Sequence, residues 1–390
     1  MFRSLLSVRV VVVLMVALVA VFVLACGEDE AGVTAVAVQL TASVESEVPV
    51  EAAATVVSEA IVDVVEEEPT ATVVAVVTEK PVPTVAVVAT AAVDATSEPV
   101  AAFDESRFAD VEGIVDSTNF GWPRSVETSE GVVTLDAPPM RIHSLSLGHS
   151  EILAALVDFD RLTAVYSFFV DEEQSNIAEL SSDALMIGFD PEEVVALEPD
   201  VIIASRFTNA DTVALMTGAG IPIARTALEN SALGNVQNIL LMGYLVGAEA
   251  EAIGLVDEIE ARMQFITDVL ASDEQPRVLS VSKWTSAYAA GSGSTEGGII
   301  EQAGGINAAA DSGIEGHQQV SIESIAAINP DVIIVPQPLD GATTFIAELT
   351  SSAALAEVPA VKNGEIYYVA PRHHTTLSHW NVRGIEGLAT

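Results

Sequence analysis

The sequence contains a single cysteine, Cys26, in 390 residues. No intramolecular disulfide can therefore form, and a disulfide-stabilised scaffold is excluded. Basic residues are also few: 15 Lys and Arg stand against 56 Asp and Glu, which gives a formal net charge of −41. Such an acidic surface repels nucleic acid, so we expect no nucleic-acid partner. Only one long uninterrupted apolar run is present, at the N-terminus, so the hydrophobic content of 50% does not indicate many membrane spans.

The first 26 residues have the order of a secretory signal. Arg3 and Arg9 precede an unbroken apolar run over 10–25, and Cys26 follows Val-Leu-Ala. The run is shorter than the ~20 residues that a spanning helix needs, with a retained membrane anchor as the alternative. Residues 1–25 resemble a bacterial lipoprotein signal peptide. This resemblance implies that Cys26 is lipidated and forms the mature N-terminus.

Residues 26–106 have the composition of a linker. Between 27 and 106 there are 16 acidic residues and one basic residue, Lys80, with neither Trp nor Tyr. We expect an acidic, low-complexity tether that is extended by its own charge. Its valine content leaves local β structure as the alternative.

The remaining residues, 107–390, alternate between predicted strands and helices, an order typical of a parallel α/β fold. A hairpin-like strand is expected at 131–135. The further predicted strands are 141–147, 162–168, 200–205 and 221–225, and the predicted helices are 149–157, 190–199, 209–220 and 233–247. A longer helix is predicted over 248–270, because apolar residues recur there at steps of three and four.

An internal repeat indicates two similar lobes. The segment EEVVALEPDVII at 192–203 returns as ESIAAINPDVII at 323–334. We therefore predict an α/β fold with two Rossmann-like lobes of parallel sheets flanked by helices. The lobes cover 107–247 and 272–390, and a single bridging helix at 248–271 joins them. Ligands of open α/β sheets bind beyond the carboxyl ends of the strands, so a cleft between the lobes is expected.

Four sequence segments, in the same order along the chain, resemble those of one family, the ABC-transporter substrate-binding proteins of the ferric-siderophore, haem and cobalamin class. They are PPMRIHSLSLGHSEILAAL at 138–156, GFDPEEVVALEPDVIIAS at 188–205, the pair AGSGSTEGGIIEQAGGINAAADSG and VSIESIAAINPDVIIV within 290–335, and VPAVKNGEIYYV at 358–369. The resemblance implies a monomeric, lipid-tethered receptor outside the cytoplasmic membrane. Such a receptor captures an iron chelate, a ferric siderophore or haem, and delivers it to an ABC-importer permease.

Two alternatives to this function stay open. Cobalamin is the alternative ligand within the same class. A lipid-anchored α/β hydrolase is the alternative from another class, although no G-x-S-x-G motif or other catalytic constellation is present, so we expect no enzyme and no catalytic cofactor.

Glu192 and Glu323 occupy the same position of the repeat, near the start of a predicted helix. An acidic residue there compensates the helix dipole without any partner. The family resemblance implies a second role, in which both glutamates dock on arginines of the permease.

The candidate ligand residues follow predicted strands. Basic side chains suit anionic chelates, aromatic rings suit flat or apolar ligand faces, and imidazole or phenol could ligate iron. The cleft candidates are His149, Tyr166, Arg206, Lys283, Trp284, Tyr288, His317, Arg372, His373 and His374. The candidate iron ligands among them are His149, His317, His373, Tyr166 and Tyr288. Ordinary roles remain open for each: polar loop positions for the histidines and surface charge for the cations. His143 lies within a strand and is expected in the core, and no zinc-type spacing is present.

Overall fold

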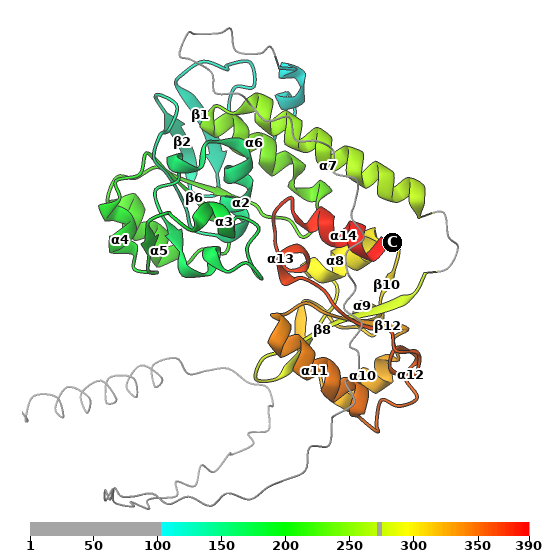
Figure 1. Cartoon of the computed structure of the whole chain (residues 1–390). Helices are drawn as coiled ribbons and strands as arrows, with labels where there is room; N and C mark the ends of the chain where they lie inside the picture. Colours follow the sequence, from blue (N-terminus) through cyan, green and yellow to red (C-terminus); the bar gives the residue numbers. More distant parts are fainter. Residues whose placement is uncertain (1–102, 271–274, 390) are drawn as a thin grey trace, which may run out of the picture. The chain divides into compact units, whose positions relative to one another are not determined.

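The computed structural model describes residues 103–270 and 275–389 (Figure 1). The predicted signal peptide, Cys26 and nearly all of the predicted tether lie outside these ranges. Within them, no helix combines the length and the apolar character needed to cross a membrane.

The first lobe contains three small sheets. Strands β3 (Ile142–Ser144), β6 (Val201–Ser205) and β7 (Ile223–Thr226) form a parallel sheet in the order β3-β6-β7. Strands β4 (Val165–Tyr166) and β5 (Met186–Ile187) form a parallel pair. Strands β1 (Arg124–Thr128) and β2 (Gly131–Leu135) form an antiparallel hairpin, and β1 contacts β7. The predicted strand positions are thus confirmed, with β2 at the predicted bounds and β3, β4, β6 and β7 shorter than predicted.

The first-lobe helices begin where the sequence supplies caps. Helix α2 (Leu147–Leu156) is capped by Ser146, and α4 (Pro191–Ala196) by Asp190, whose side chains accept backbone N–H groups of the first turn. Asn209 caps α5 (Ala210–Gly218) in the same way. The other helices of this lobe are α3 (Ala178–Ser181), α6 (Val236–Val246), η1 (Glu105–Phe108), η2 (Phe159–Arg161), η3 (Ser167–Val170) and η4 (Leu233–Asn235).

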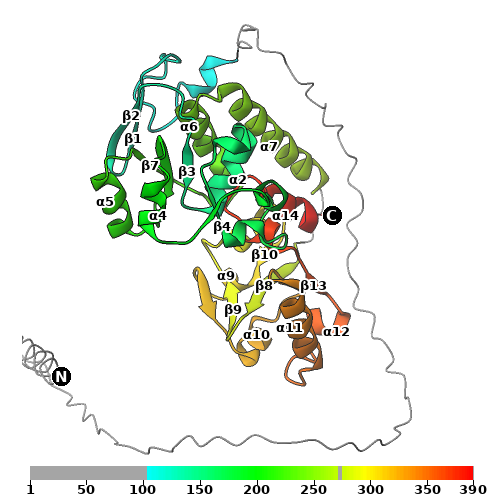
Figure 2. The same cartoon turned by 60° about the vertical axis from the view of Figure 1, so that its left-hand side comes forward.

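The second lobe holds one mixed sheet in the order β11-β9-β8-β12-β13, with β10 also on β8. Figure 2 shows β8, β9 and β13 of this lobe, with the helices α10, α11 and α12 below them. Its strands are β8 (Arg277–Lys283), β9 (Ala287–Ala290), β10 (Ile306–Asn307), β11 (His317–Gln319), β12 (Val332–Val335) and β13 (Ile366–Tyr368). Strand β9 runs antiparallel to β8 and β11, which differs from the purely parallel lobe predicted. Only residues 284–286 separate β8 from β9, and three residues are too few for a crossover helix.

Seven helices of the second lobe are described. They are α8 (Thr295–Gln302), α9 (Ala308–Asp311), α10 (Ile322–Ile328), α11 (Leu339–Ser351), α12 (Pro359–Asn363), α13 (Pro371–His374) and α14 (Asn381–Ala389). Ser321 caps α10, as Asp190 caps α4 at the same position of the repeat.

The predicted long helix is α7 (Glu249–Val269), which runs beside α6 (Figure 1). Its buried residues include Val256, Ile259, Met263 and Ile266, which are among the apolar residues that recur at steps of three and four in the sequence. They belong to a core that also contains Ile152 of α2 and Ile299 of α8, together with residues of α14. Helix α7 therefore packs on elements from both halves of the repeat. The domain boundaries themselves stay predictions.

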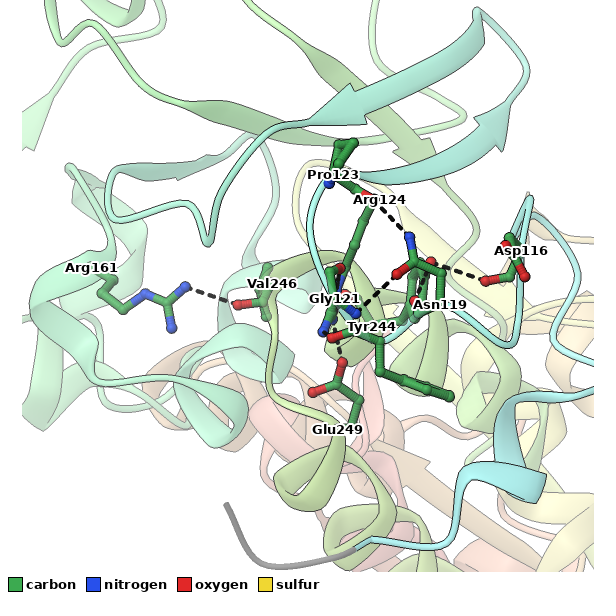
Figure 3. Close-up of polar contacts among 10 residues, drawn as sticks. Asp116, Asn119, Gly121, Pro123, Arg124, Arg161, Tyr244, Val246 and Glu249 are labelled. Atoms are coloured by element: carbon green, nitrogen blue, oxygen red, sulfur yellow. Dashed lines mark hydrogen bonds and ion pairs between the residues drawn. The ribbon is translucent and has the colours of Figure 1, made fainter. Parts of the chain in front are cut away.

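A buried cation attaches the hairpin to the junction of α6 and α7 (Figure 3). The Arg124 guanidinium pairs with the Glu249 carboxylate and donates to the carbonyls of Tyr244, Gly121 and Phe120. Both charged side chains are buried. A buried charge is tolerated when it is paired and its donors are used. Here the partners of Arg124 come from the segment just before β1 and from the ends of α6 and α7 that adjoin each other.

Candidate functional site

The loops that follow the parallel strands of the two lobes contact each other. Arg372, which comes after β13, donates its backbone N–H to the Glu173 carbonyl at 3.1 Å and its guanidinium to the Glu172 carbonyl at 2.7 Å. Leu339, after β12, donates its N–H to the Glu173 carboxylate at 2.8 Å. Glu172 and Glu173 follow β4 and η3. The carboxyl ends of strands from both lobes therefore lie at one boundary, the arrangement in which open α/β sheets bind ligands.

A second set of contacts joins the lobes at the end of β7. Asn230 donates its side-chain N–H to the Gly293 carbonyl at 2.7 Å and accepts from the Thr295 hydroxyl at 3.0 Å. The β7 end thus meets the start of α8. Two cavities, of about 340 and 360 Å³, are lined by none of the candidate ligand residues, so the ligand cleft stays a prediction.

His149, the first residue of the predicted helix 149–157, lies in the first turn of α2 and is not a loop residue. It is fully buried in the first turn of α2, where Nδ1 lies 2.7 Å from the Ser146 hydroxyl and Nε2 lies 2.8 Å from the Thr226 hydroxyl. Burial lowers its pKa to about 3. Both ring nitrogens are used, so iron ligation would require breaking one of the two hydrogen bonds in a fully buried site.

His143 and Tyr166 form a buried pair. The His143 ring bonds to the Thr163 hydroxyl at 3.0 Å and to the Tyr166 hydroxyl at 3.2 Å, which matches the core position expected for this histidine. Burial lowers the pKa of His143 to about 4 and raises that of Tyr166 to about 12. A phenol held protonated in this way is a poor candidate for iron ligation.

His373 and His374 lie in the short helix α13 instead of a loop. His373 stacks on Trp380, with ring centroids 6.4 Å apart, and burial lowers its pKa to about 3. His374 is buried, with Nδ1 3.0 Å from the Ala370 carbonyl. Its Nε2 has no hydrogen-bond partner in the described part of the chain.

His317 and Tyr288 lie on the neighbouring strands β11 and β9. His317 Nε2 lies 3.0 Å from a carboxylate oxygen of Glu296, and this hydrogen bond raises the pKa of the imidazole. Tyr288 is 39% exposed and faces Gln319 across the strand pair. No cluster of three or more His, Cys, Asp or Glu that could hold a metal occurs in residues 103–270 and 275–389.

The three candidate cations differ in their contacts. Lys283 pairs with Glu348 and lies 5.6 Å from the centre of the Phe345 ring. Arg372 makes the contacts between lobes described above. Arg206 is exposed, and its guanidinium has no hydrogen bond or ion pair within the described residues, although its carbonyl accepts from Arg225. Arg206 is thus the candidate cation whose charged group has no partner among the described residues.

Exposed aromatic rings follow strands of both lobes. Trp284, directly after β8, is 66% exposed, as the prediction of a ligand contact requires. Two phenylalanines were missed by sequence reasoning: Phe207 after β6 is 87% exposed, and Phe189 after β5 is 74% exposed. Phe189 stacks on Tyr166 at 4.9 Å between centroids. Their position after strands was the available signal, but apolar residues at such positions are ordinarily assigned to the core.

Glu192 and Glu323 are exposed in the first turns of α4 and α10. A hydrogen bond from the Ser321 hydroxyl lowers the pKa of Glu323. Neither carboxylate has an ion-pair partner in the described ranges, so both are accessible to a partner protein. Their docking role stays a prediction.

The comparisons with known proteins agree with this geometry. The family described as periplasmic binding protein matches residues 142–372. A cobalamin-binding protein of Halobacterium salinarum is 27% identical over 242 residues, which cover 62% of this chain and 64% of that protein. The chain thus spans less than two thirds of the length of this curated relative.

Solved structures resemble the described fold. The periplasmic heme-binding protein RhuT from Roseiflexus sp. RS-1, in apo form, has 25% identity and a TM-score of 0.57, with coverage of 64% of this chain and 96% of that one. An ABC-type Fe3+-hydroxamate transport protein of Saccharomonospora viridis has 18% identity and a TM-score of 0.56, covering 69% and 98%, and shows the fold alone. With the family match over more than half of its length, the chain belongs to the periplasmic binding protein family.

Proposed function

We propose that this protein captures an iron chelate, haem or a ferric siderophore, outside the cytoplasmic membrane and delivers it to the permease of an ABC importer. The observation that carries the proposal is the shared boundary of the two lobes. Loops from the carboxyl ends of both sheets meet there, and the same ends present exposed aromatic rings and one cation with free donors.

The chemistry of these side chains suits a large, partly apolar anion. Phe207 and Trp284 offer faces for a flat or hydrophobic ligand. Arg206 offers charge-assisted hydrogen bonds to a carboxylate or a hydroxamate oxygen. The chain has a net charge of −41, so an anion would be repelled by most of its surface. The Arg206 guanidinium, which is unpaired within the described residues and next to the exposed Phe207 ring, provides a local position at which an anion can bind.

Among the candidate iron ligands, Tyr288 is the one we favour. His149 and Tyr166 are buried and hydrogen-bonded, and His373 is half-buried against the Trp380 ring. His317 is paired with Glu296, which favours the protonated imidazole. Tyr288 is exposed on β9, three residues before Gly291, where the loop to α8 begins.

Cobalamin is the second candidate ligand. It is favoured by the relative from Halobacterium salinarum, which is described as a cobalamin-binding protein and aligns over 242 residues. Haem is favoured by the likeness to RhuT, and both are large metal chelates with flat faces. The aromatic residues fit either ligand.

The remaining parts of the proposal concern the cell. Glu192 and Glu323, exposed on corresponding helices of the two lobes, would dock on arginines of the permease. Cys26 would carry the lipid anchor, the acidic segment 26–106 would tether the lobes to the membrane surface, and the protein would act as a monomer. It would bind and release its ligand without chemical conversion.

Ligand-induced quenching of tryptophan fluorescence tests the proposed site. We expect haemin or a ferric hydroxamate to quench the parent protein, and Trp284→Phe to remove most of the quenching because Trp284 is the exposed tryptophan beside the strand end. Arg206→Ala should weaken binding about tenfold, as expected for the loss of a charge-assisted hydrogen bond. The matched control is Arg107→Ala, since Arg107 pairs with Asp257 and Glu260 on the outer side of α7. Equal affinities of the Arg206→Ala variant and the parent would contradict the proposed site.

A further inference from the structure

One arginine that the proposed site does not use holds the loop after β6. Arg225 lies on β7, in register with Ala204 of β6. Its Nε donates to the Ser205 carbonyl at 3.3 Å, and its Nη2 donates to the carbonyls of Arg206 and Thr208 at 2.7 and 2.8 Å. Three carbonyl groups of one short loop therefore converge on a single guanidinium.

The guanidinium is itself fixed from the other side. Its Nη1 lies 2.5 Å from the Glu130 carboxylate, which stands in the turn between β1 and β2. The Arg225 side chain is only 12% exposed. A planar guanidinium presents five donors in a fixed fork, and here four contacts come from one side chain at set angles. A lysine ammonium at the same position would keep the charge but could not reach the three carbonyls and the carboxylate together.

The loop held by Arg225 carries two of the side chains assigned to the ligand. Arg206 is exposed with no partner for its guanidinium in the described residues, and Phe207 is 87% exposed. Arg225 thus holds the carbonyls on both sides of Phe207, and the Phe207 N–H donates to the Ser205 hydroxyl, while the side chains of Arg206 and Phe207 are exposed. Asn209, which follows, caps α5 and fixes the far end of the loop.

We propose that Arg225 is a positioning residue for ligand binding, which fixes the backbone of 205–208 so that Arg206 and Phe207 are arranged before the ligand arrives. The inference rests on the proposed function, because it assumes that these two side chains contact the ligand. Fixing a loop in its bound conformation raises affinity by lowering the ordering cost on binding. Arg225 therefore acts through Arg206 and Phe207 and need not touch the ligand.

The test is a double-mutant cycle on ligand affinity in the full chain. The probe is whichever of haemin, a ferric hydroxamate and cyanocobalamin the parent binds. We expect Arg225→Lys to weaken binding about tenfold, a coupling of ordinary size for residues that share one network. In a protein that already carries Arg206→Ala and Phe207→Ala, Arg225→Lys should change the affinity less than about twofold.

A matched control keeps general destabilisation apart from positioning. Arg277 at the start of β8 also pairs with a carboxylate, that of Asp311, and donates to a carbonyl, that of Ile328 at 3.1 Å, but it lies at the opposite strand end. Arg277→Lys should leave the affinity unchanged. Hydrogen exchange should become faster at the amides of 206–208 in Arg225→Lys and stay as in the parent for β12.

Three outcomes would overturn the inference. The first is that the parent binds a probe and Arg225→Lys binds it with the same affinity; this result leaves the proposed function intact. The second is that Arg225→Lys weakens binding as much in the protein that carries Arg206→Ala and Phe207→Ala as it does in the parent. The third is a parent that binds none of the probes, which overturns the proposed function as well. If Arg225→Lys does not fold, Glu130→Ala, which removes the carboxylate that orients the guanidinium, replaces it in the cycle with an expected loss of about threefold.

Discussion

Glu151 of the first lobe accepts a hydrogen bond of 2.7 Å from the Thr376 hydroxyl of the second lobe. The same carboxylate oxygen accepts from the Ser378 hydroxyl, and the other oxygen accepts from the backbone and side-chain N–H groups of Asn176, each at 2.9 Å. Glu151 is buried, and burial raises the pKa of its carboxyl while the four hydrogen bonds oppose this shift. One side chain thus joins α2 to the segment after α13.

Removal of this carboxylate should loosen the contact between the lobes. Glu151→Ala leaves buried donors without an acceptor, so we expect the free energy of unfolding to fall by ~3 kcal/mol or more. Denaturant unfolding measures it. Glu151→Gln is the control, because its amide oxygen still accepts from Asn176 and the two hydroxyls can donate or accept. Equal stability of the Ala and Gln variants would show that the buried contacts contribute little.

Acid should destabilise the protein through its buried histidines. The pKa of His149 is lowered to about 3 from 6.5, so the unfolded state takes up a proton first as the pH falls. The stability that the neutral imidazole contributes is complete above pH 6.5 and is lost progressively between pH 6.5 and about 3. When the pH is lowered from 6 to 5, the free energy of unfolding should fall in both proteins. This fall should be up to ~1.4 kcal/mol smaller in His149→Gln than in the parent.

His317 provides the control for that experiment. The pKa of His317 is raised by Glu296. The stability that the protonated imidazole contributes is therefore complete below pH 6.5 and is lost as the pH rises through the raised pKa of the folded state. His317→Gln should therefore leave the slope between pH 6 and 5 close to that of the parent. An unchanged slope in His149→Gln would mean that His149 accepts a proton in the folded state.

The buried ion pair of Arg124 and Glu249 should matter far more than an exposed one. Arg124→Ala leaves a buried carboxylate and several buried carbonyls unpaired, and we expect a loss of ~3–5 kcal/mol in the free energy of unfolding. Lys362→Ala removes the partner of Glu357 in an exposed pair and should give no measurable change. Similar thermal unfolding of the two variants would contradict the burial of Arg124.

The glutamates proposed to dock on the permease, Glu192 and Glu323, should affect transport without affecting ligand binding. In cells that contain the cognate permease, Glu192→Ala with Glu323→Ala should lower ligand uptake ~10-fold or more, because charges at an interface act on association and register. Ligand affinity should stay unchanged. Glu179→Ala with Glu301→Ala removes two other exposed helical glutamates as the control. Parent-like uptake in the first double variant would show that the permease is recognised elsewhere.

The repeat predicted much of the fold, since EEVVALEPDVII and ESIAAINPDVII give α4 with β6 and α10 with β12. The antiparallel β9 and β11 were not predicted, because strand direction depends on connection length and pairing. Nor does local periodicity reveal that α14 shares a core with α2 and α7. Those contacts join segments far apart in the sequence.

The candidate site was harder to predict for a related reason. His149 has the residue type and position of a ligand, but Ser146 starts a helix before it and Thr226, 77 residues away, occupies its second nitrogen. Arg372 was placed correctly after a strand, yet its guanidinium is used between the lobes. Phe207 was missed because a phenylalanine after a buried strand is usually a core residue.

The central claim is that the two lobes bind a metal chelate at their shared boundary, and equilibrium dialysis of the purified protein tests it most directly. The dialysis medium contains haemin, a ferric hydroxamate or cyanocobalamin, each in turn, with parent protein and with the Arg206→Ala and Trp284→Phe double variant. We predict one bound chelate per chain for the parent and much weaker retention by the double variant. Retention of none of the three by the parent would contradict the account.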